Sequence, residues 1–222
     1  MTTNPKATTI LCYGDSNTWG QKPDKSGRYP VDVRWTGRLQ KQLGEDYYVI
    51  EEGLSSRTTD LEYAKKPGRN GKTYLMPCLV SQNPIDLVIL MLGTNDLKVE
   101  FNRSPEDIAN AVKGLVADIK EYAFVKPNVP PKVLVVGPIH VNDQARDFQD
   151  LYGGVYYDAG SAAKSRLLAD ALQSIVNETE SAFFDASTVS EPGEDGIHFS
   201  EAAHAALASA LVQHVHDLVP RP

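Results

Sequence analysis

Five short apolar runs alternate with segments of helical periodicity along the chain. The runs are Thr9–Tyr13, Tyr48–Glu51, Asp86–Leu92, Lys132–Val136 and Ala182–Phe184. The third and fourth runs contain the uninterrupted apolar stretches Leu-Val-Ile-Leu-Met-Leu and Val-Leu-Val-Val, which are typical of central parallel strands covered on both faces. This alternation predicts an α/β fold, a three-layer α/β/α sandwich with a five-stranded parallel sheet and right-handed crossovers.

Capping residues and helical spacing predict where the helices between these strands begin. Asp32 is a candidate N-cap for a first helix that ends at Gly44. A weaker pattern covers Thr73–Ser81. Ser104-Pro-Glu-Asp107 combines a serine cap, proline at the first position and acids in the first turn, which is a strong helix start.

Two further helices are predicted in the C-terminal third of the chain. One runs from about Asp158 to Asn177, and Ser200 caps the other. The residues expected to face inward from these two helices are Leu167, Ala171, Leu172, Ile175, Leu207, Leu211, Val215 and Leu218.

Length and composition indicate one ordinary globular domain over residues 1–222, without a composition shift or an internal repeat. A formal net charge of −7 argues against nucleic-acid or anionic-membrane partners. The chain has no run of 18 apolar residues and its first residues are polar, so we expect a cytoplasmic protein. Cys12 and Cys78 lie in apolar segments away from metal-ligand spacing, and we expect no metal or other cofactor.

Polar residues follow four of the predicted strands. They are Ser16, Ser55-Ser56, Thr94-Asn95-Asp96 and the segment Asp195–His198. Loops that follow parallel strands emerge at the same edge of a sheet, where open α/β folds bind their ligands. These polar groups are therefore expected to converge, although they are far apart in sequence.

Their chemistry suits acyl transfer. A serine hydroxyl needs a base within hydrogen-bond reach, and His198 is the best candidate for activating Ser16. Asp195 can accept from the other ring nitrogen and hold the imidazole in position. Asp185, at the end of the fifth strand, is the second choice for this carboxylate.

The remaining histidines are weaker candidates. His204, His214 and His216 fall on the last predicted helix and are expected to be solvated. His140 follows the fourth strand and could reach a substrate pocket, although a plain surface loop is the alternative there.

An acyl-transfer site also needs hydrogen-bond donors for the developing oxyanion. Asn95 can donate through its side-chain amide, and the backbone N–H of Ser16 lies near a helix start. The segment Gly53–Ser56 offers a further main-chain N–H after the second strand.

These motifs resemble the SGNH hydrolases, often called GDSL-type esterases, and are most similar to their arylesterase–acyltransferase branch. The resemblance covers nearly the whole chain. It rests on Gly-Asp-Ser16-Asn-Thr-Trp-Gly, Asp-Val-Arg-Trp-Thr-Gly37, Glu51-Glu-Gly-Leu-Ser-Ser-Arg-Thr-Thr, Met91-Leu-Gly-Thr-Asn-Asp and Asp195-Gly-Ile-His-Phe. It implies a flavodoxin-like fold, a homo-oligomer, and Ser16 as nucleophile with Asp195 and His198 as its partners. It also implies an oxyanion site from Ser16, Asn95 and the second block of the family, which is the motif that begins at Glu51 here.

The chain departs from the family pattern in three places. Asn17 replaces the leucine of the family name and is expected to affect the turn more than the chemistry. Ser56 occupies the position of the second-block glycine, so either Ser56 or Gly53 could supply the backbone donor. The polar segment Ile139–Tyr157 is expected to cover the site and to alter substrate preference.

The sequence therefore predicts a serine esterase that acts on a small ester, acetyl esters above all, and that could pass the acyl group to an alcohol. A carbohydrate O-acetyl esterase or a thioesterase on the same scaffold is the alternative, and a catalytically silent binding protein is a remote one. A nucleotide-binding domain is disfavoured because no glycine-rich phosphate loop follows the first strand. The residues expected at the pocket rim are Trp19, Arg57, Lys98 and His140.

Overall fold

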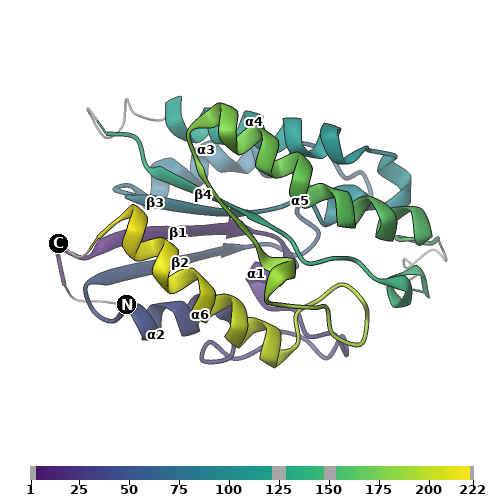
Figure 1. Cartoon of the computed structure of the whole chain (residues 1–222), viewed down its shortest axis with the longest axis horizontal. Coiled ribbons are helices and arrows are strands. Elements are labelled where there is room, and N and C mark those ends of the chain that lie inside the picture. Colours follow the sequence, from purple (N-terminus) through teal and green to yellow (C-terminus); the bar gives the residue numbers. More distant parts are fainter. Residues whose placement is uncertain (1–3, 122–128, 148–153, 221–222) are drawn as a thin grey trace.

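A parallel five-stranded sheet forms the centre of the molecule (Figure 1). The computed structural model describes residues 4–121, 129–147 and 154–220. The strand order is β2-β1-β3-β4-β5, and every neighbouring pair is parallel. The strands are β1 (Thr8–Gly14), β2 (Tyr47–Gly53), β3 (Leu87–Met91), β4 (Lys132–Gly137) and β5 (Ala182–Asp185). The predicted sandwich is confirmed.

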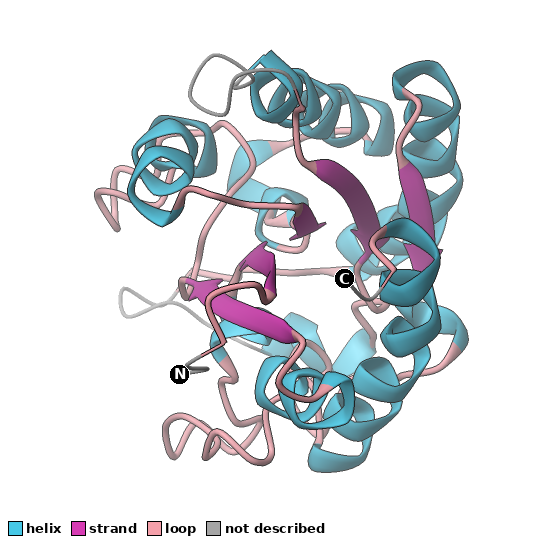
Figure 2. Cartoon of the chain, turned by 90° about the vertical axis from the view of Figure 1, so that its left-hand side faces the viewer, coloured by secondary structure: helices cyan, strands magenta, loops and turns pink. Residues whose placement is uncertain are grey.

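Helices cover both faces of this sheet (Figure 2). The α-helices are α1 (Ser16–Trp19), α2 (Trp35–Leu43), α3 (Gly71–Gln82), α4 (Pro105–Glu121), α5 (Ala159–Thr179) and α6 (Glu201–Leu218). Short 3₁₀ helices lie at Asn95–Leu97, Val99–Phe101, Asp143–Asp147 and Ala186–Thr188. None of the helices in the described part of the chain is long and apolar enough to cross a membrane.

The alternation of side chains along β1 creates two cores. Leu11 and Tyr13 pack with α3, α4 and α5, whereas Ile10 and Cys12 pack with α2 and α6 on the other face. All four side chains are fully buried. The continuous apolar runs of the central strands follow from this, because each strand must be apolar on both faces.

Three of the predicted helix starts are confirmed by side-chain caps. Ser104 Oγ accepts from the Asp107 N–H at 3.1 Å, and Asp107 accepts from the Ser104 N–H at 3.0 Å, a reciprocal capping box. Asp158 caps α5 through the Ser161 N–H, and Ser200 caps α6 through the Ala203 N–H.

Two details of the helix prediction are wrong. Asp32 does not cap α2, which begins at Trp35 after a turn, with Arg34 at the cap position. The Arg34 guanidinium instead binds the Glu51 carboxylate of β2 at 2.7 Å, so this turn is held against the sheet by its side chain. Leu167 is 58% exposed, because the adjacent Leu168 faces the core instead, in line with Leu172 and Ile175, which are buried as predicted.

The path of the chain through the sheet changes direction beside β1. From β1 the chain crosses to β2 on one side, and it then returns to β3 on the other side. The loops after β1 and β3 diverge at this switch point, which is where open α/β sheets leave room for a ligand.

Candidate active site

Ser16 lies at the carboxyl end of β1, as the first residue of the short helix α1. Asp15 caps this helix, and its carboxylate accepts from the Asn17 N–H at 2.9 Å. Gly20 ends the helix in the left-handed conformation, at φ 88°. This tight turn holds the Ser16 side chain at the sheet edge, where it is 6% exposed.

His198 connects Ser16 to Asp195. His198 Nε2 lies 2.9 Å from Ser16 Oγ, and His198 Nδ1 lies 2.5 Å from an Asp195 carboxylate oxygen. A carboxylate only accepts, so Nδ1 carries the proton and Nε2 can accept from the serine hydroxyl. This is the geometry that a histidine base requires.

Asp195 is also held by the backbone of its own loop. Its other carboxylate oxygen accepts from the Ile197 N–H at 3.0 Å and the His198 N–H at 2.9 Å. Burial alone would raise the pKa of Asp195, but the His198 ring and these two N–H groups lower it below its usual value. The carboxylate therefore stays ionised beside the imidazole.

Asn17 fixes the position of the His198 loop, a role that sequence reasoning missed. Its side-chain amide donates to the Ile197 carbonyl at 3.1 Å, and its carbonyl oxygen accepts from the Phe199 N–H at 2.9 Å. The residues on both sides of His198 are thus tied to the helix that carries Ser16. Asn17 acts on more than its own turn, because an amide can donate and accept at once.

Asn95 follows β3, and its side-chain amide is oriented by three neighbours. Its Nδ2 donates to the Arg57 carbonyl at 3.0 Å, while Lys98 Nζ donates to its Oδ1 at 2.8 Å. A lysine ammonium has no acceptor, so the oxygen of the Asn95 amide must face Lys98. The NH₂ group is thereby directed away from Lys98, and besides the Arg57 carbonyl it faces the Asp15 carboxylate, with Nδ2 at 3.4 Å from Asp15 Oδ2.

The loop after β3 is also fastened to the loop after β2. The fully buried Asp96 carboxylate accepts from the Thr59 N–H and hydroxyl, and from Arg103 at 3.2 Å. Burial raises the pKa of Asp96 to about 6, although these donors oppose the shift. These contacts keep Asn95 and the second block at a constant separation.

Of the two second-block candidates, Ser56 lies at the site. It lines the cavity beside Ser16, and its φ of 66° is in the left-handed region that favours glycine. Gly53 belongs to β2, where a Cβ atom would lie 2.2 Å from the Trp19 nitrogen. No acceptor among the described residues is assigned to the backbone N–H of Ser16 or of Ser56.

A cavity of about 120 Å³ opens in front of the Ser16 hydroxyl. Of the four predicted rim residues, Lys98 lines it, whereas Trp19, Arg57 and His140 are not among its described lining residues. Arg57 is buried beneath the site, where it binds the Gly14 carbonyl at 2.9 Å and stacks on Tyr13. The lining residues are Ser16, Gln21, Ser55, Ser56, Lys66, Asn95, Lys98, Tyr156, Tyr157, Ile197 and His198.

The segment Ile139–Tyr157 contributes to this cavity at its C-terminal end. Tyr156 and Tyr157 line the wall of the cavity, and Tyr157 is nearly completely buried. Residues 148–153 of the segment lie outside the described residues. Sequence reasoning marked the segment as a cover but did not single out the two tyrosines, although paired aromatics in a polar loop are a usable signal.

Asp185, the alternative carboxylate, is engaged elsewhere. It caps the short helix Ala186–Thr188 and accepts from the Ser187 N–H at 2.9 Å.

The partly buried His214 and His216 are not solvated rings, since His214 packs on Phe184 and His216 on Tyr47.

His204 contradicts the prediction of a solvated ring most clearly, because it is fully buried. Its Nδ1 accepts from the Trp35 N–H at 3.2 Å, and its ring packs edge-on against Tyr29 and Phe199. The spacing of apolar residues along α6 did not predict this burial, because the His204 ring fills space between α6 and the start of α2. Burial lowers the pKa of His204 to about 3, and the charges of Arg38 and Arg34 act in the same direction.

We expect His204 to make folding stability depend on pH. The folded state holds the ring neutral, while the unfolded chain binds a proton near pH 6.5. Its contribution is therefore present above pH 6.5 and is lost progressively as the pH falls toward 3. Urea unfolding at pH 7, 6, 5 and 4 should show a smaller loss of stability for His204→Asn, which keeps an acceptor for Trp35. Parallel curves for the parent and the variant would contradict this expectation.

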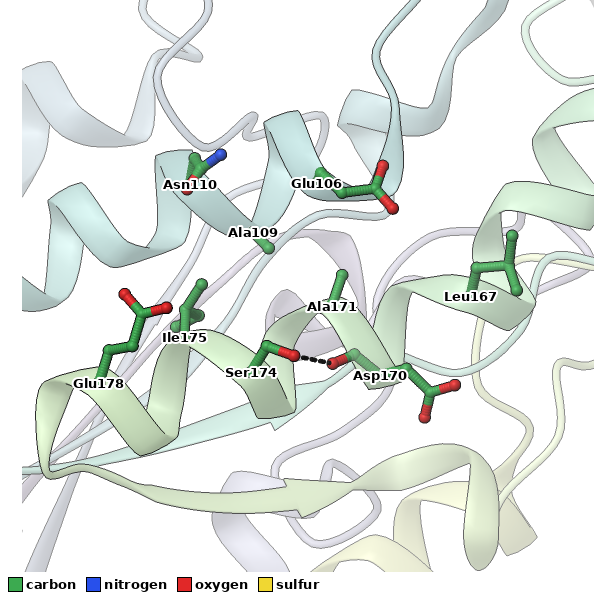
Figure 3. Close-up of a pocket in the computed structure, with 9 residues that line it drawn as sticks. All are labelled: Glu106, Ala109, Asn110, Leu167, Asp170, Ala171, Ser174, Ile175 and Glu178. Carbon is green, nitrogen blue, oxygen red and sulfur yellow. Dashed lines mark hydrogen bonds between the residues drawn. The ribbon is translucent and has the colours of Figure 1, made fainter.

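A second hollow, of about 440 Å³, lies between α4 and α5 (Figure 3). Glu106, Asp170 and Glu178 line it, and Ser174, which carries the one hydroxyl among its described lining residues, donates to the Asp170 carbonyl. It is larger than the cavity at Ser16, but its described lining places no nucleophile beside a base. The described residues also contain no group of three or more histidine, cysteine or acidic side chains placed to hold a metal ion.

Comparison with known proteins agrees with this geometry. Residues 12–206 match the family described as GDSL-like lipase/acylhydrolase. The structure is similar to that of the aryl esterase of M. smegmatis, at 42% identity over 96% of this chain and 100% of that one, with a TM-score of 0.88.

It is also similar to a carbohydrate acetylesterase from Sinorhizobium meliloti, at 38% identity over 95% of this chain and 99% of that one, with a TM-score of 0.87. A comparison with curated proteins gave no match. The family match spans most of the chain and includes the loops that carry Ser16, Asn95 and His198. The chain belongs to the GDSL-like lipase/acylhydrolase family of ester hydrolases.

Proposed function

We propose that the protein hydrolyses small carboxylic esters, acetyl esters in particular, through an acyl-serine intermediate on Ser16. The observation that carries this proposal is the continuous chain from Asp195 through His198 to Ser16, which ends at a cavity of about 120 Å³. So small a space favours a short acyl group.

In the first half-reaction His198 Nε2 takes the proton of the Ser16 hydroxyl as Oγ bonds to the ester carbonyl carbon. The negative charge moves to the carbonyl oxygen, where the Asn95 side-chain NH₂ and the N–H groups of Ser16 and Ser56 can donate to it. The bond to the alcohol oxygen then breaks, and the alcohol leaves with the proton from His198.

In the second half-reaction water attacks the acyl-Ser16 carbonyl while His198 again takes a proton. The ester bond to Oγ breaks, the serine regains its proton, and the carboxylic acid is released. An alcohol in place of water would yield a new ester by the same steps. The likeness to a carbohydrate acetylesterase, together with the polar Gln21, Ser55 and Ser56 on the cavity wall, favours sugar acetates as a second substrate class.

A serine-directed fluorophosphonate tests the covalent step. We expect it to label the folded protein on Ser16, as located by peptide mass spectrometry, because Ser16 is the one serine of the described residues whose hydroxyl is shown bonded to an imidazole. Prior incubation with excess phenyl acetate should slow the labelling, and His198→Ala should greatly reduce it. Absence of labelling in the folded parent, or labelling at another serine, would refute the proposal.

A further inference from the structure

The described lining of the cavity at Ser16 contains basic side chains, although the chain as a whole is acidic. The protein carries a formal net charge of −7. The described lining of the cavity nevertheless contains two lysines, Lys66 and Lys98, and no aspartate or glutamate. A basic lining in an acidic protein indicates that the molecule that enters the cavity is negatively charged.

Lys98 forms the inner part of this basic lining, where burial favours its neutral form. It is only 3% exposed, and its ammonium lies 4.6 Å from the Tyr63 ring centre and 5.0 Å from that of Tyr156. Burial lowers the pKa of Lys98 to about 7, and the nearby Lys66 ammonium adds to the shift. Its bond to Asn95 Oδ1 occupies one of its three donors.

Lys66 forms the outer part and is half-buried. Its Nζ donates to Ser56 Oγ at 3.0 Å and lies 5.5 Å from the Tyr156 ring centre. No carboxylate of the described residues forms a salt bridge with Lys66, whereas the adjacent Lys65 is paired with Glu100 at 3.5 Å. A partly desolvated ammonium with one neutral acceptor retains the capacity to bind an anion.

We propose that the substrate carries a carboxylate close to its ester bond and that Lys66 binds this carboxylate at the cavity mouth. This proposal rests on the proposed esterase function and assigns its substrate class. Charge-assisted hydrogen bonds are stronger than neutral ones, and a partly enclosed cavity screens them less than bulk water does. The small volume requires the carboxylate and the ester to be only a few bonds apart.

The carboxylate could belong to the alcohol or to the acyl group, and two substrate pairs distinguish these sources. The first pair is 4-acetoxybenzoate and its neutral methyl ester. The second pair is phenyl hydrogen succinate and phenyl butanoate. For each pair the quantity measured is the ratio of kcat/KM for the anionic ester to that for the neutral ester.

In Lys66→Gln this ratio should fall about tenfold for at least one pair, since the lost contact is a charge-assisted one at a half-buried site. Lys65→Gln makes the same change in net charge one residue away and should leave both ratios unchanged. The preference of the parent should weaken as salt is raised from 0.05 to 0.5 M, because Lys66 is partly exposed to solvent.

Comparing ratios between variants cancels the different intrinsic reactivities of the esters. If the parent hydrolyses neither member of either pair, the proposed esterase function itself fails. If the parent hydrolyses the neutral esters but Lys66→Gln changes neither ratio, or changes them no more than Lys65→Gln does, only the carboxylate proposal is overturned.

Discussion

Ser16→Ala is expected to lower kcat for phenyl acetate by roughly 10⁴-fold or more, the size of loss seen when a serine hydrolase loses its nucleophile. The hydroxyl is the group aligned with His198 Nε2 at 2.9 Å, and no other described serine hydroxyl bonds to that imidazole. Without it no acyl-enzyme can form, and the remaining donors can only polarise the ester for attack by water. The measurement is steady-state release of phenol at pH 8.

Ser174→Ala is the matched control for this substitution. It removes the same hydroxyl from an exposed turn of α5, where the group bonds only to the Asp170 carbonyl of its own helix (Figure 3). This control should keep the parental rate. A Ser16→Ala protein that retained a tenth of the parental activity would show that the reaction does not pass through this serine.

Asn95→Ala is expected to lower kcat by roughly 10²–10³-fold with a much smaller change in KM, as for other side-chain oxyanion donors. The charge on the carbonyl oxygen develops mainly in the transition state, so the lost hydrogen bond should affect turnover rather than ground-state binding. The orientation imposed by Lys98 and the Arg57 carbonyl makes the Asn95 amide the side-chain donor on this wall.

Asn95→Asp keeps the shape and an acceptor for Lys98 but removes the donor, and it places a second carboxylate beside that of Asp15. It should be about as inactive as the alanine variant, whereas Asn110→Ala on the exposed face of α4 should be unaffected. If the Asn95 variants lowered kcat/KM only by raising KM, with kcat unchanged, Asn95 would be assigned to substrate binding instead. Thermal unfolding of each variant shows whether the loss reflects the site or the fold.

Much of this site could be predicted because each candidate follows a strand of a parallel sheet. The edge at which such strands end brings Ser16, Asn95 and His198 together whatever their separation in sequence. The side-chain caps of α4, α5 and α6 and the continuous apolar strands are equally local signals, and they predicted the order of these elements correctly. Local sequence patterns predict a residue's role correctly when that role depends on residues adjacent to it in the chain.

Predictions failed where the direction of a side chain depends on a distant element. Arg57 follows β2 but turns beneath the sheet edge to stack on Tyr13, and His204 turns inward to meet α2. Asn17 binds residues that lie 180 positions away, a pairing that no spacing rule reveals. Assembly state and cellular location are not encoded in these motifs, so the homo-oligomer and the cytoplasmic location stay predictions.

The clamp between Asn17 and the His198 loop has a consequence for the order of events during protein synthesis. Ser16 leaves the ribosome well before His198, which lies 182 positions later and is followed directly by α6, the helix that completes the second core. An incomplete chain therefore carries an unactivated hydroxyl, which is a poor nucleophile at neutral pH. Reactivity toward esters should arise abruptly, when α6 docks, so that chains that end before α6 should not react with esters.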